Sequence, residues 1–189
     1  MAGKWLDILP VNAKTRSSTL ARIEGEIEMN IQTIPESLKN ISLRPLFVVQ
    51  IALKPIVVVG DAPGGFRRVG VVTGGLFEGD RLAGQVLDGG NDWQLLRRDG
   101  SLLLDVRLIL KTNDDELVTM AYRGIRHGPA EVLKSIDQGI EVDPTRYYFR
   151  INPLFETASK KYGWLNNILA IGSGYRSASA VVYSIFEVL

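Results

Sequence analysis

The segment from Gly89 to Asp105, GGNDWQLLRRDGSLLLD, constrains the fold more than any other part of the chain. It reads as a turn, a strand, a tight turn around Asp99-Gly100 and a second strand. Polar and apolar residues alternate along it, which is the period-two pattern of β-structure. The two acids Asp92 and Asp105 are therefore expected in neighbouring β-strands.

The same pattern continues from Leu46 to the end of the chain. Apolar or alternating runs are separated by turn sequences such as Ala62-Pro63-Gly64-Gly65 and Glu78-Gly79-Asp80. These residues supply positive φ angles or side-chain-capped turns. About nine strands at hairpin spacing predict a mostly all-β domain built as an antiparallel β-barrel.

One short helix is expected to interrupt the strands. His127-Gly128-Pro129 places a proline at a helix start, and Gly139 supplies a stop. Between these signals four apolar residues keep helical spacing, namely Val132, Leu133, Ile136 and Ile140.

Residues 1–43 differ from the rest and are predicted to form a helical extension before a β-barrel domain at 44–189. Apolar residues recur there at three- and four-residue intervals with glutamates between them, at Leu20, Ile23, Ile27 and Ile31. This spacing is typical of an amphipathic helix that packs on the barrel or on a partner subunit. A second short pattern runs from Pro35 through Leu38 to Ile41. The alternative is a frayed terminal tail.

Composition excludes several classes of protein. With 46% apolar and 23% charged residues the chain is neither disordered nor membrane-spanning, because no apolar run approaches the ~20 residues that a spanning helix needs. A formal charge of +1 gives no general attraction to nucleic acid or anionic lipid, so neither partner is expected. The N-terminal sequence lacks the apolar segment of a secretory signal, and we expect a cytoplasmic location.

Cysteine is absent and His127 is the one histidine. Disulfides, thiolate metal sites and cysteine nucleophiles are therefore excluded, and a multi-histidine metal site cannot form within one chain. We expect no cofactor and no metal.

Two strands carry polar residues in places that suit a pocket. Asp105 and Arg107 alternate with Leu103 and Ile109 on one face of the strand at 102–110, whose other face is entirely apolar. If both faces are buried, the acid and the arginine are the polar groups of a cavity. The alternative is an ion pair on a solvated sheet face.

Aromatic residues accompany further polar groups in the last third of the chain. Tyr148 and Arg150 share a strand face, Trp164 and Asn166 share a side, and Glu156 follows a strand. Aromatic walls with a few convergent polar groups describe a small-molecule pocket. For any single aromatic residue the alternative is an ordinary place in the β-core.

The ordered strings GGFRR, TGGLFEG, LAGQVL, DGSLLLDVR, RGIRHGP, DPTRYYFR and YGWLNN resemble an uncharacterised family, domain of unknown function 3237, also called uncharacterised protein family 0311. The resemblance covers the chain from about Leu46 onward and leaves out the N-terminal extension. It implies a barrel akin to the calycin and allene oxide cyclase barrels, which bind or cyclise small apolar molecules. This is a likeness of fold, and no activity transfers with it.

The first functional hypothesis is a cofactor-free enzyme acting on a small carbonyl-bearing or aromatic metabolite by isomerisation, cyclisation or lyase chemistry. Asp105 or Asp92 would be the base, while Arg107 or Arg150 and Tyr148 would hold the developing oxyanion. These five residues form the predicted catalytic set.

The second hypothesis is a carrier or sensor whose arginines bind a small carboxylate-bearing ligand, with Trp93 or Trp164 stacked on it. Turnover discriminates between the two, because a carrier leaves its ligand unchanged. The predicted ligand-binding residues are Trp93, Gln94, Arg126, Glu156, Trp164 and Asn166. Because the strand at 102–110 needs cover on both faces, we also expect a homo-oligomer, a dimer or a trimer.

Overall fold

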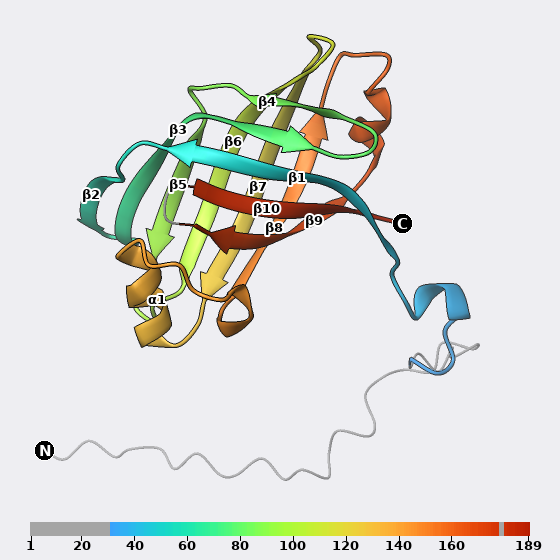
Figure 1. The fold of residues 1–189 in the computed structure, drawn as a ribbon. Helices are drawn as coiled ribbons and strands as arrows, with labels where there is room; N and C mark the ends of the chain where they lie inside the picture. The colour runs from blue at the N-terminus through green and yellow to red at the C-terminus, as the bar shows by residue number, and fades with distance from the viewer. Residues whose placement is uncertain (1–30, 178–179) are drawn as a thin grey trace, which may run out of the picture. The chain divides into compact units, whose positions relative to one another are not determined.

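Antiparallel β-strands make up most of the described chain (Figure 1). The structure is a computed structural model that describes residues 31–177 and 180–189. The chain divides into two compact units, Met1–Asn40 and Ile41–Leu189. In chain order the elements are η1 (Glu36–Leu38), β1 (Leu43–Leu53), β2 (Val57–Ala62), β3 (Gly65–Glu78), β4 (Ala83–Val86), β5 (Asn91–Leu96), β6 (Leu102–Thr112), β7 (Leu117–His127), α1 (Ala130–Asp137), η2 (Pro144–Arg146), β8 (Tyr148–Glu156), η3 (Gly163–Asn167), β9 (Ala170–Arg176) and β10 (Ala180–Val188).

The described part of the first unit, residues 31–40, contains the single 3₁₀ turn η1. Leu38 on this turn is exposed, as is Ile31, the last residue of the predicted helical stripe. The other residues of that stripe, Leu20, Ile23 and Ile27, lie outside the described residues.

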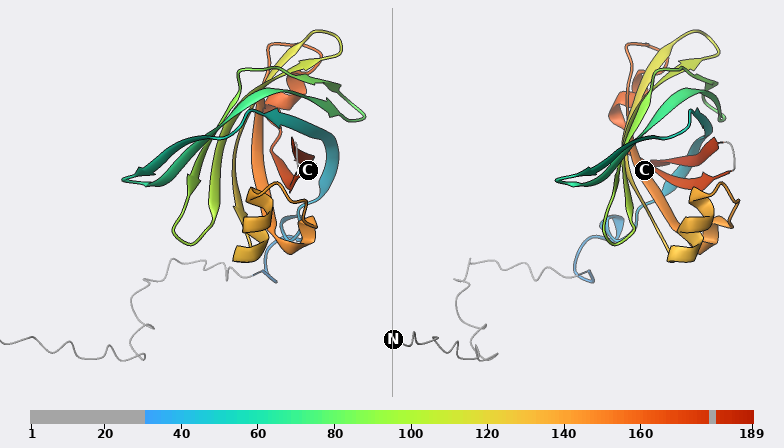
Figure 2. Two further views of the ribbon diagram at one scale, coloured as in Figure 1. Left: turned by 60° about the vertical axis from the view of Figure 1, so that its left-hand side comes forward. Right: turned by 90° about the vertical axis from the view of Figure 1, so that its left-hand side faces the viewer.

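Eight strands of the second unit close into a barrel, which confirms the predicted antiparallel β-barrel with one helix. Neighbours follow the order β1-β10-β9-β8-β7-β6-β4-β3, and β1 pairs with β3 to complete the ring. β2 and β5 lie off this closed path. β2 extends the sheet from β3, so that the β2–β3 hairpin projects beyond the barrel (Figure 2).

β4 and β5 lie one after the other between the same two neighbouring strands. Both pair with β3 on one side and with β6 on the other. Between them the chain makes a turn at Asp88-Gly89, where the Gly89 N–H donates to Val72 O and the Val72 N–H donates to Gly90 O. After this interruption, β5 directs Asp92 and Gln94 into the barrel. The burial of the side chains shows this direction, since both are buried while Trp93 between them is 57% exposed.

Two sequence predictions are corrected in detail. The described chain has ten strands rather than about nine, because the valine-rich run at 57–62 forms β2 with its valines exposed. The apolar run Leu165–Ile171 suits one strand by its sequence, but it begins in the 3₁₀ turn η3 and becomes strand only at Ala170. The Asn166 side chain explains the turn, because it accepts from the Thr157 N–H and donates to Thr157 O in place of a strand partner.

The helix α1 lies at one end of the barrel, where the sequence places it (Figure 1). Val132 and Ile136 are its buried residues, and the chain leaves it through Gly139 at φ +78°. Among the described residues, no helix has the length and apolar character to cross a bilayer.

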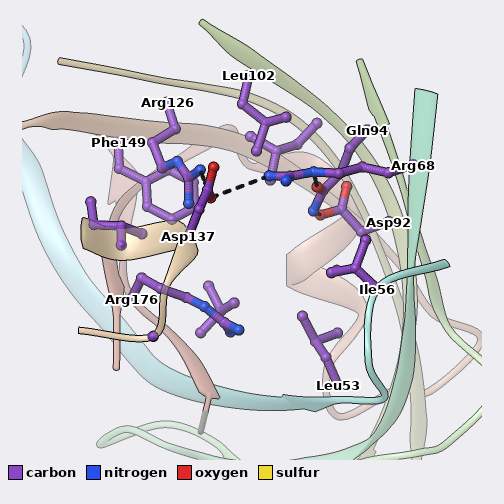
Figure 3. A pocket seen from close by; sticks show the side chains of 14 residues that line it. Leu53, Ile56, Arg68, Asp92, Gln94, Leu102, Arg126, Asp137, Phe149 and Arg176 are labelled. Atoms are coloured by element: carbon purple, nitrogen blue, oxygen red, sulfur yellow. Dashed lines mark hydrogen bonds and ion pairs between the residues drawn. The ribbon is translucent and has the colours of Figure 1, made fainter. Parts of the chain in front are cut away.

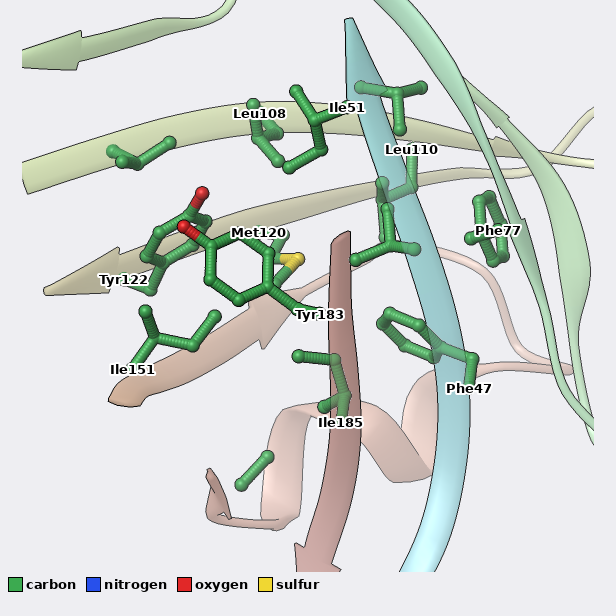
Figure 4. Close-up of a cluster of buried hydrophobic side chains, with 14 of the residues drawn as sticks. Phe47, Ile51, Phe77, Leu108, Leu110, Met120, Tyr122, Ile151, Tyr183 and Ile185 are labelled. Carbon is green, nitrogen blue, oxygen red and sulfur yellow. The ribbon is translucent and has the colours of Figure 1, made fainter. Parts of the chain in front are cut away.

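Alternate residues of the strands fill the barrel interior (Figure 4). Phe47 packs against Phe77 and Phe155 with ring centroids 5.5 and 5.8 Å apart, and Tyr122 meets Tyr183 at 5.5 Å. Each fully buried aromatic or aliphatic side chain contributes roughly 1.5–3 kcal/mol to stability. The apolar packing therefore fixes the barrel around the polar residues at the α1 end.

The seam between β1 and β3 depends on a glycine. Gly75 lies opposite Ile51 with φ +156°, and a Cβ on it would lie 2.0 Å from Gln50 O. We predict that Gly75→Ala lowers the free energy of unfolding by about 3 kcal/mol, because strain and a backbone clash both act at the seam. Urea denaturation measures this.

Gly163→Ala is the matched control, because a Cβ there would have no neighbour within 4 Å. We expect this variant to stay within about 0.5 kcal/mol of the wild type. Equal stability of the two variants would contradict a seam that requires glycine.

Candidate functional site

A cavity of about 150 Å³ lies inside the barrel at the end near α1 (Figure 3). Its walls come from strands far apart in the sequence and from the C-terminal turn of α1. The apolar lining is formed by Leu53, Ile56, Leu102, Leu104, Ile136, Phe149 and Val181. The polar lining is formed by Arg68, Asp92, Gln94, Arg126, Asp137 and Arg176.

Hydrogen bonds join the polar lining into a chain. The Gln94 amide donates to Asp92 Oδ2 at 2.5 Å and accepts from Arg68 Nε at 2.6 Å. Arg68 Nη2 also lies 3.6 Å from Asp137 Oδ1, to which Arg126 Nη2 donates at 2.8 Å. Two carboxyl groups and two guanidinium groups are thus linked around one side of the cavity.

Three buried polar atoms of the lining have no hydrogen-bond partner among the described residues. They are Asp92 Oδ1, Arg126 Nε and Arg176 Nη1. Buried polar atoms are nearly always paired, so an unpaired one needs an explanation. Here one acceptor and two donors belong to residues that line the same cavity.

Burial controls the charge of Asp92. It raises the pKa of the Asp92 carboxyl to about 6, although the Gln94 hydrogen bond, the nearby backbone N–H of Asp105 and the charges of Arg68 and Arg126 all act to lower it. The loss of solvation therefore outweighs the attraction of the arginines. At neutral pH this carboxyl is close enough to its pKa to exchange a proton with a bound molecule.

Two tyrosines lie deeper in the barrel and interact with Asp92. Burial, more than any other cause, raises the pKa of both the Tyr122 and the Tyr183 hydroxyl, and the charge of Asp92 raises it further. Both phenols therefore stay protonated across the physiological range. Desolvation is also the largest cause that lowers the pKa of Arg176, and the positive charge of Arg126 is the second.

Of the eleven residues predicted for a site, three line this cavity: Asp92, Gln94 and Arg126. Sequence analysis missed Arg68, Asp137 and Arg176. Arg68 is in the quoted string GGFRR and is the cross-strand partner of Gln94, so its inward direction follows once the pairing of β3 with β5 is known. Arg176 ends β9 and Asp137 ends α1, and no local sequence signal marks either residue for the cavity.

The expectation that Asp105 and Arg107 share the cavity is wrong. Cross-strand partners point to the same side of a sheet, and the partner of Asp92 is Val106. Asp105, one residue earlier, therefore points outward. Its carboxylate lies 3.3 Å from Arg107 with the two side chains 41% and 73% exposed, which makes them the surface ion pair that was the alternative interpretation.

The expectation that Tyr148 and Arg150 face the cavity is also wrong, because both are exposed on the outer wall. The Tyr148 ring stacks on His127 at 4.9 Å and lies 5.0 Å from Arg150 Cζ. These two residues border an outer groove with Arg123 instead.

The remaining predicted ligand-binding residues do not line the cavity either. Trp93 points outward from β5, and Glu156 is exposed at the end of β8. Trp164 lies beneath Arg81, whose Cζ is 4.0 Å from the ring centroid, and Asn166 bonds to Thr157. Among the described residues, no group of three or more histidine or acidic side chains is placed to hold a metal ion.

Known proteins are similar to this chain in sequence and in fold. The family model described as "Protein of unknown function (DUF3237)" matches residues 41–188. A UPF0311 protein of Rhodopseudomonas palustris is 38% identical over 130 residues, which cover 69% of this chain and 85% of that protein.

Two crystal structures are similar throughout the barrel. A conserved protein of unknown function from Rhodopseudomonas palustris aligns with a TM-score of 0.74 at 33% identity, covering 79% of this chain and 98% of that one. A β-barrel-like protein from Acinetobacter baumannii aligns with a TM-score of 0.70 at 41% identity, covering 79% and 97%. The ordered motifs, the barrel and these relatives agree, and the chain belongs to the DUF3237 family.

Proposed function

We propose that the barrel cavity binds a small organic anion and that Asp92 exchanges a proton with it, so that the protein is a cofactor-free isomerase, cyclase or lyase for a compact carbonyl compound. One observation carries this proposal. Asp92 Oδ1, Arg126 Nε and Arg176 Nη1 are buried and unpaired among the described residues, and all three residues line one cavity.

The charges of the lining favour an anion. Arg68, Arg126 and Arg176 bring three guanidinium groups, which stay protonated at any physiological pH. Only two carboxyl groups oppose them within the lining, and burial keeps that of Asp92 partly protonated. An anionic oxygen on the ligand would offset the excess positive charge and accept from the free donors.

The size of the cavity restricts the ligand further. A volume of about 150 Å³ matches a cavity that holds one benzene ring. Leu102, Leu104 and Phe149 supply an apolar wall beside the polar groups. The site therefore suits a molecule of roughly six to ten non-hydrogen atoms with one apolar side and one anionic end.

Proton transfer at a carbon beside a carbonyl fits this arrangement. The Asp92 carboxylate would take the proton while Arg126 Nε and Arg176 Nη1 donate to the enolate oxygen that forms. Return of the proton to a different atom gives isomerisation. Expulsion of a leaving group from the next carbon, which takes the electron pair of the broken bond, gives a lyase. Gln94, bonded to Asp92 Oδ2, would keep the other oxygen directed at the ligand.

A non-catalytic carrier or sensor of a small carboxylate is the second candidate. The pairing of Asp137 with Arg126 favours it, because the guanidinium already binds a carboxylate at 2.8 Å. The two candidates share the site and differ in whether the ligand changes.

We predict that the protein catalyses deuterium exchange at the carbon beside the carbonyl of a compact keto acid, and that Asp92→Asn lowers the rate by about 10²- to 10⁴-fold. Proton NMR in heavy water with pyruvate, 2-oxobutyrate and acetoacetate measures the exchange. Asp105→Asn is the matched control, because it removes an outer-wall carboxyl of the neighbouring strand. Binding without exchange in the wild type would identify a carrier instead.

Asp92 also predicts a pH dependence of stability. Its pKa rises from 3.8 to about 6 on folding, so between these values the folded protein binds more protons than the unfolded chain. The free energy of unfolding must then fall as pH rises, by on the order of 3 kcal/mol across about pH 4 to 6.

Asp92→Asn should lose this contribution, so the wild type should become less stable relative to the variant as pH rises. Urea denaturation of both proteins at intervals between about pH 4 and 7 measures the difference. Parallel stability profiles would show that Asp92 ionises as freely in the folded barrel as in the unfolded chain.

We also propose that the protein self-associates through the outer wall. Ile109, Leu154 and Ile171 are exposed there on β6, β8 and β9. Apolar surface of this kind commonly marks an interface between subunits.

We predict a dimer or trimer in sedimentation velocity at micromolar concentration, and a monomer after Leu154→Lys with Ile171→Lys. Val58→Lys on β2 is the control, because Val58 is an exposed apolar residue on a strand off the closed barrel. A monomeric wild type would contradict this proposal and leave the cavity proposal intact.

A further inference from the structure

Asp137 differs from the other polar residues of the cavity in being carried by a helix. Its Oδ1 accepts from Arg126 Nη2 at 2.8 Å and lies 3.6 Å from Arg68 Nη2. The Asp137 side chain is 44% exposed, whereas that of Arg126 is 8% exposed. The carboxylate therefore lies between a buried guanidinium and solvent.

The helix itself does not favour a carboxylate at this position. Asp137 is the last residue of α1, and the C-terminal end of a helix carries partial negative charge. Repulsion from that end acts against the carboxylate, so the two arginines must hold it where it is.

Asp137 could leave Arg126 without unpacking the helix. α1 is anchored by Val132 and Ile136, which are buried on its inner side. Beyond Asp137 the chain turns through Gly139, where a Cβ would meet no atom within 4 Å. A change of side-chain rotamer toward solvent is therefore enough to free the guanidinium.

We propose that Asp137 is an internal carboxylate that competes for Arg126, and that the carboxylate of a small acid displaces it on binding. This inference rests on the proposed function, because it assumes that the cavity receives an anion. It identifies the anionic group as a carboxylate, since the Arg126 guanidinium already binds one through Nη2.

Competition of this kind makes the site selective for carboxylates and also lowers the affinity with which they bind. A neutral analogue has no charge with which to replace Asp137, so it is rejected. A carboxylate binds with an apparent affinity reduced by the fraction of time that Arg126 is free. Removing the competitor should therefore tighten binding, although it removes a polar group from the site.

The test is isothermal titration of benzoate into the wild type, Asp137→Asn and Glu131→Gln. We expect Asp137→Asn to bind benzoate about five- to thirtyfold more tightly than the wild type, by the release of Arg126. Glu131→Gln makes the same change of charge in the first turn of α1, away from the cavity lining, and should leave the affinity within about twofold. Benzamide, which is neutral, should bind the wild type at least about tenfold more weakly than benzoate.

A crystal structure of the wild type with benzoate distinguishes displacement of Asp137 from simple repulsion between Asp137 and the ligand. It also does not depend on the folding of a variant. We expect the benzoate carboxylate on Arg126 and the Asp137 side chain turned to solvent. Bound benzoate with Asp137 still on Arg126, or unchanged or weaker binding to Asp137→Asn, would overturn this inference and spare the proposed function. Failure of formate, acetate, pyruvate and benzoate to bind either protein would overturn both.

Discussion

Burial of guanidinium groups inside an apolar barrel is the constraint on which the site depends. Arg126 is almost fully buried, and an arginine cannot lose its charge to escape the cost. Its pairing with Asp137, whose own side chain is 44% exposed, offsets part of that cost. The charges of the cavity are therefore linked through Arg126, and Asp137 is the partner that solvent can reach.

Asp92 shows which effect dominates in this system. The Gln94 hydrogen bond, the nearby backbone N–H of Asp105 and the charges of two arginines lower its pKa, and burial still raises the value to about 6. A net rise from 3.8 corresponds to a free energy of about 3 kcal/mol against the charged form. Desolvation therefore outweighs the combined effect of the neighbouring cations and hydrogen bonds.

The barrel determines which residues surround this carboxyl through rows of cross-strand partners. Asp92 lies between Gly70 on β3 and Val106 on β6, and Val106 pairs in turn with Tyr122. A Cβ at Gly70 would lie 3.6 Å from the Asp92 Cβ, which is an ordinary van der Waals contact, so the smallest residue is the β3 neighbour of the acid in this row. Phenylalanine rings pack against one another elsewhere in the core.

The fold followed from the sequence because strand alternation and turn chemistry are local signals. Those signals also place Asp92 and Gln94 on one face of their strand. They do not say which face of β6 points inward, since Leu103 and Ile109 make its outer face partly apolar as well. Asp105 entered the predicted site because the sequence analysis took both faces of this strand as buried, whereas the face that carries Asp105 and Arg107 is turned to solvent.

Arg68, Arg176 and Asp137 were beyond prediction for a different reason. Each reaches the cavity through contacts between segments distant in the sequence, as in the ion pair between Arg126 and Asp137 or the bond between Arg68 and Gln94. The neighbouring sequence does not predict these contacts, because they form only when the barrel has closed.

The energetic cost of Asp92 itself bears on the choice between enzyme and carrier. A barrel that merely carries an anion needs arginines, and an asparagine in place of Asp92 would keep a bond to Gln94 without the penalty of a buried charge. At neutral pH the carboxyl weakens the fold by on the order of 3 kcal/mol relative to a group that ionises freely in solvent. It also repels the anion that the arginines attract. A site that gives and takes a proton would offset both disadvantages, and for this reason we proposed catalysis rather than transport.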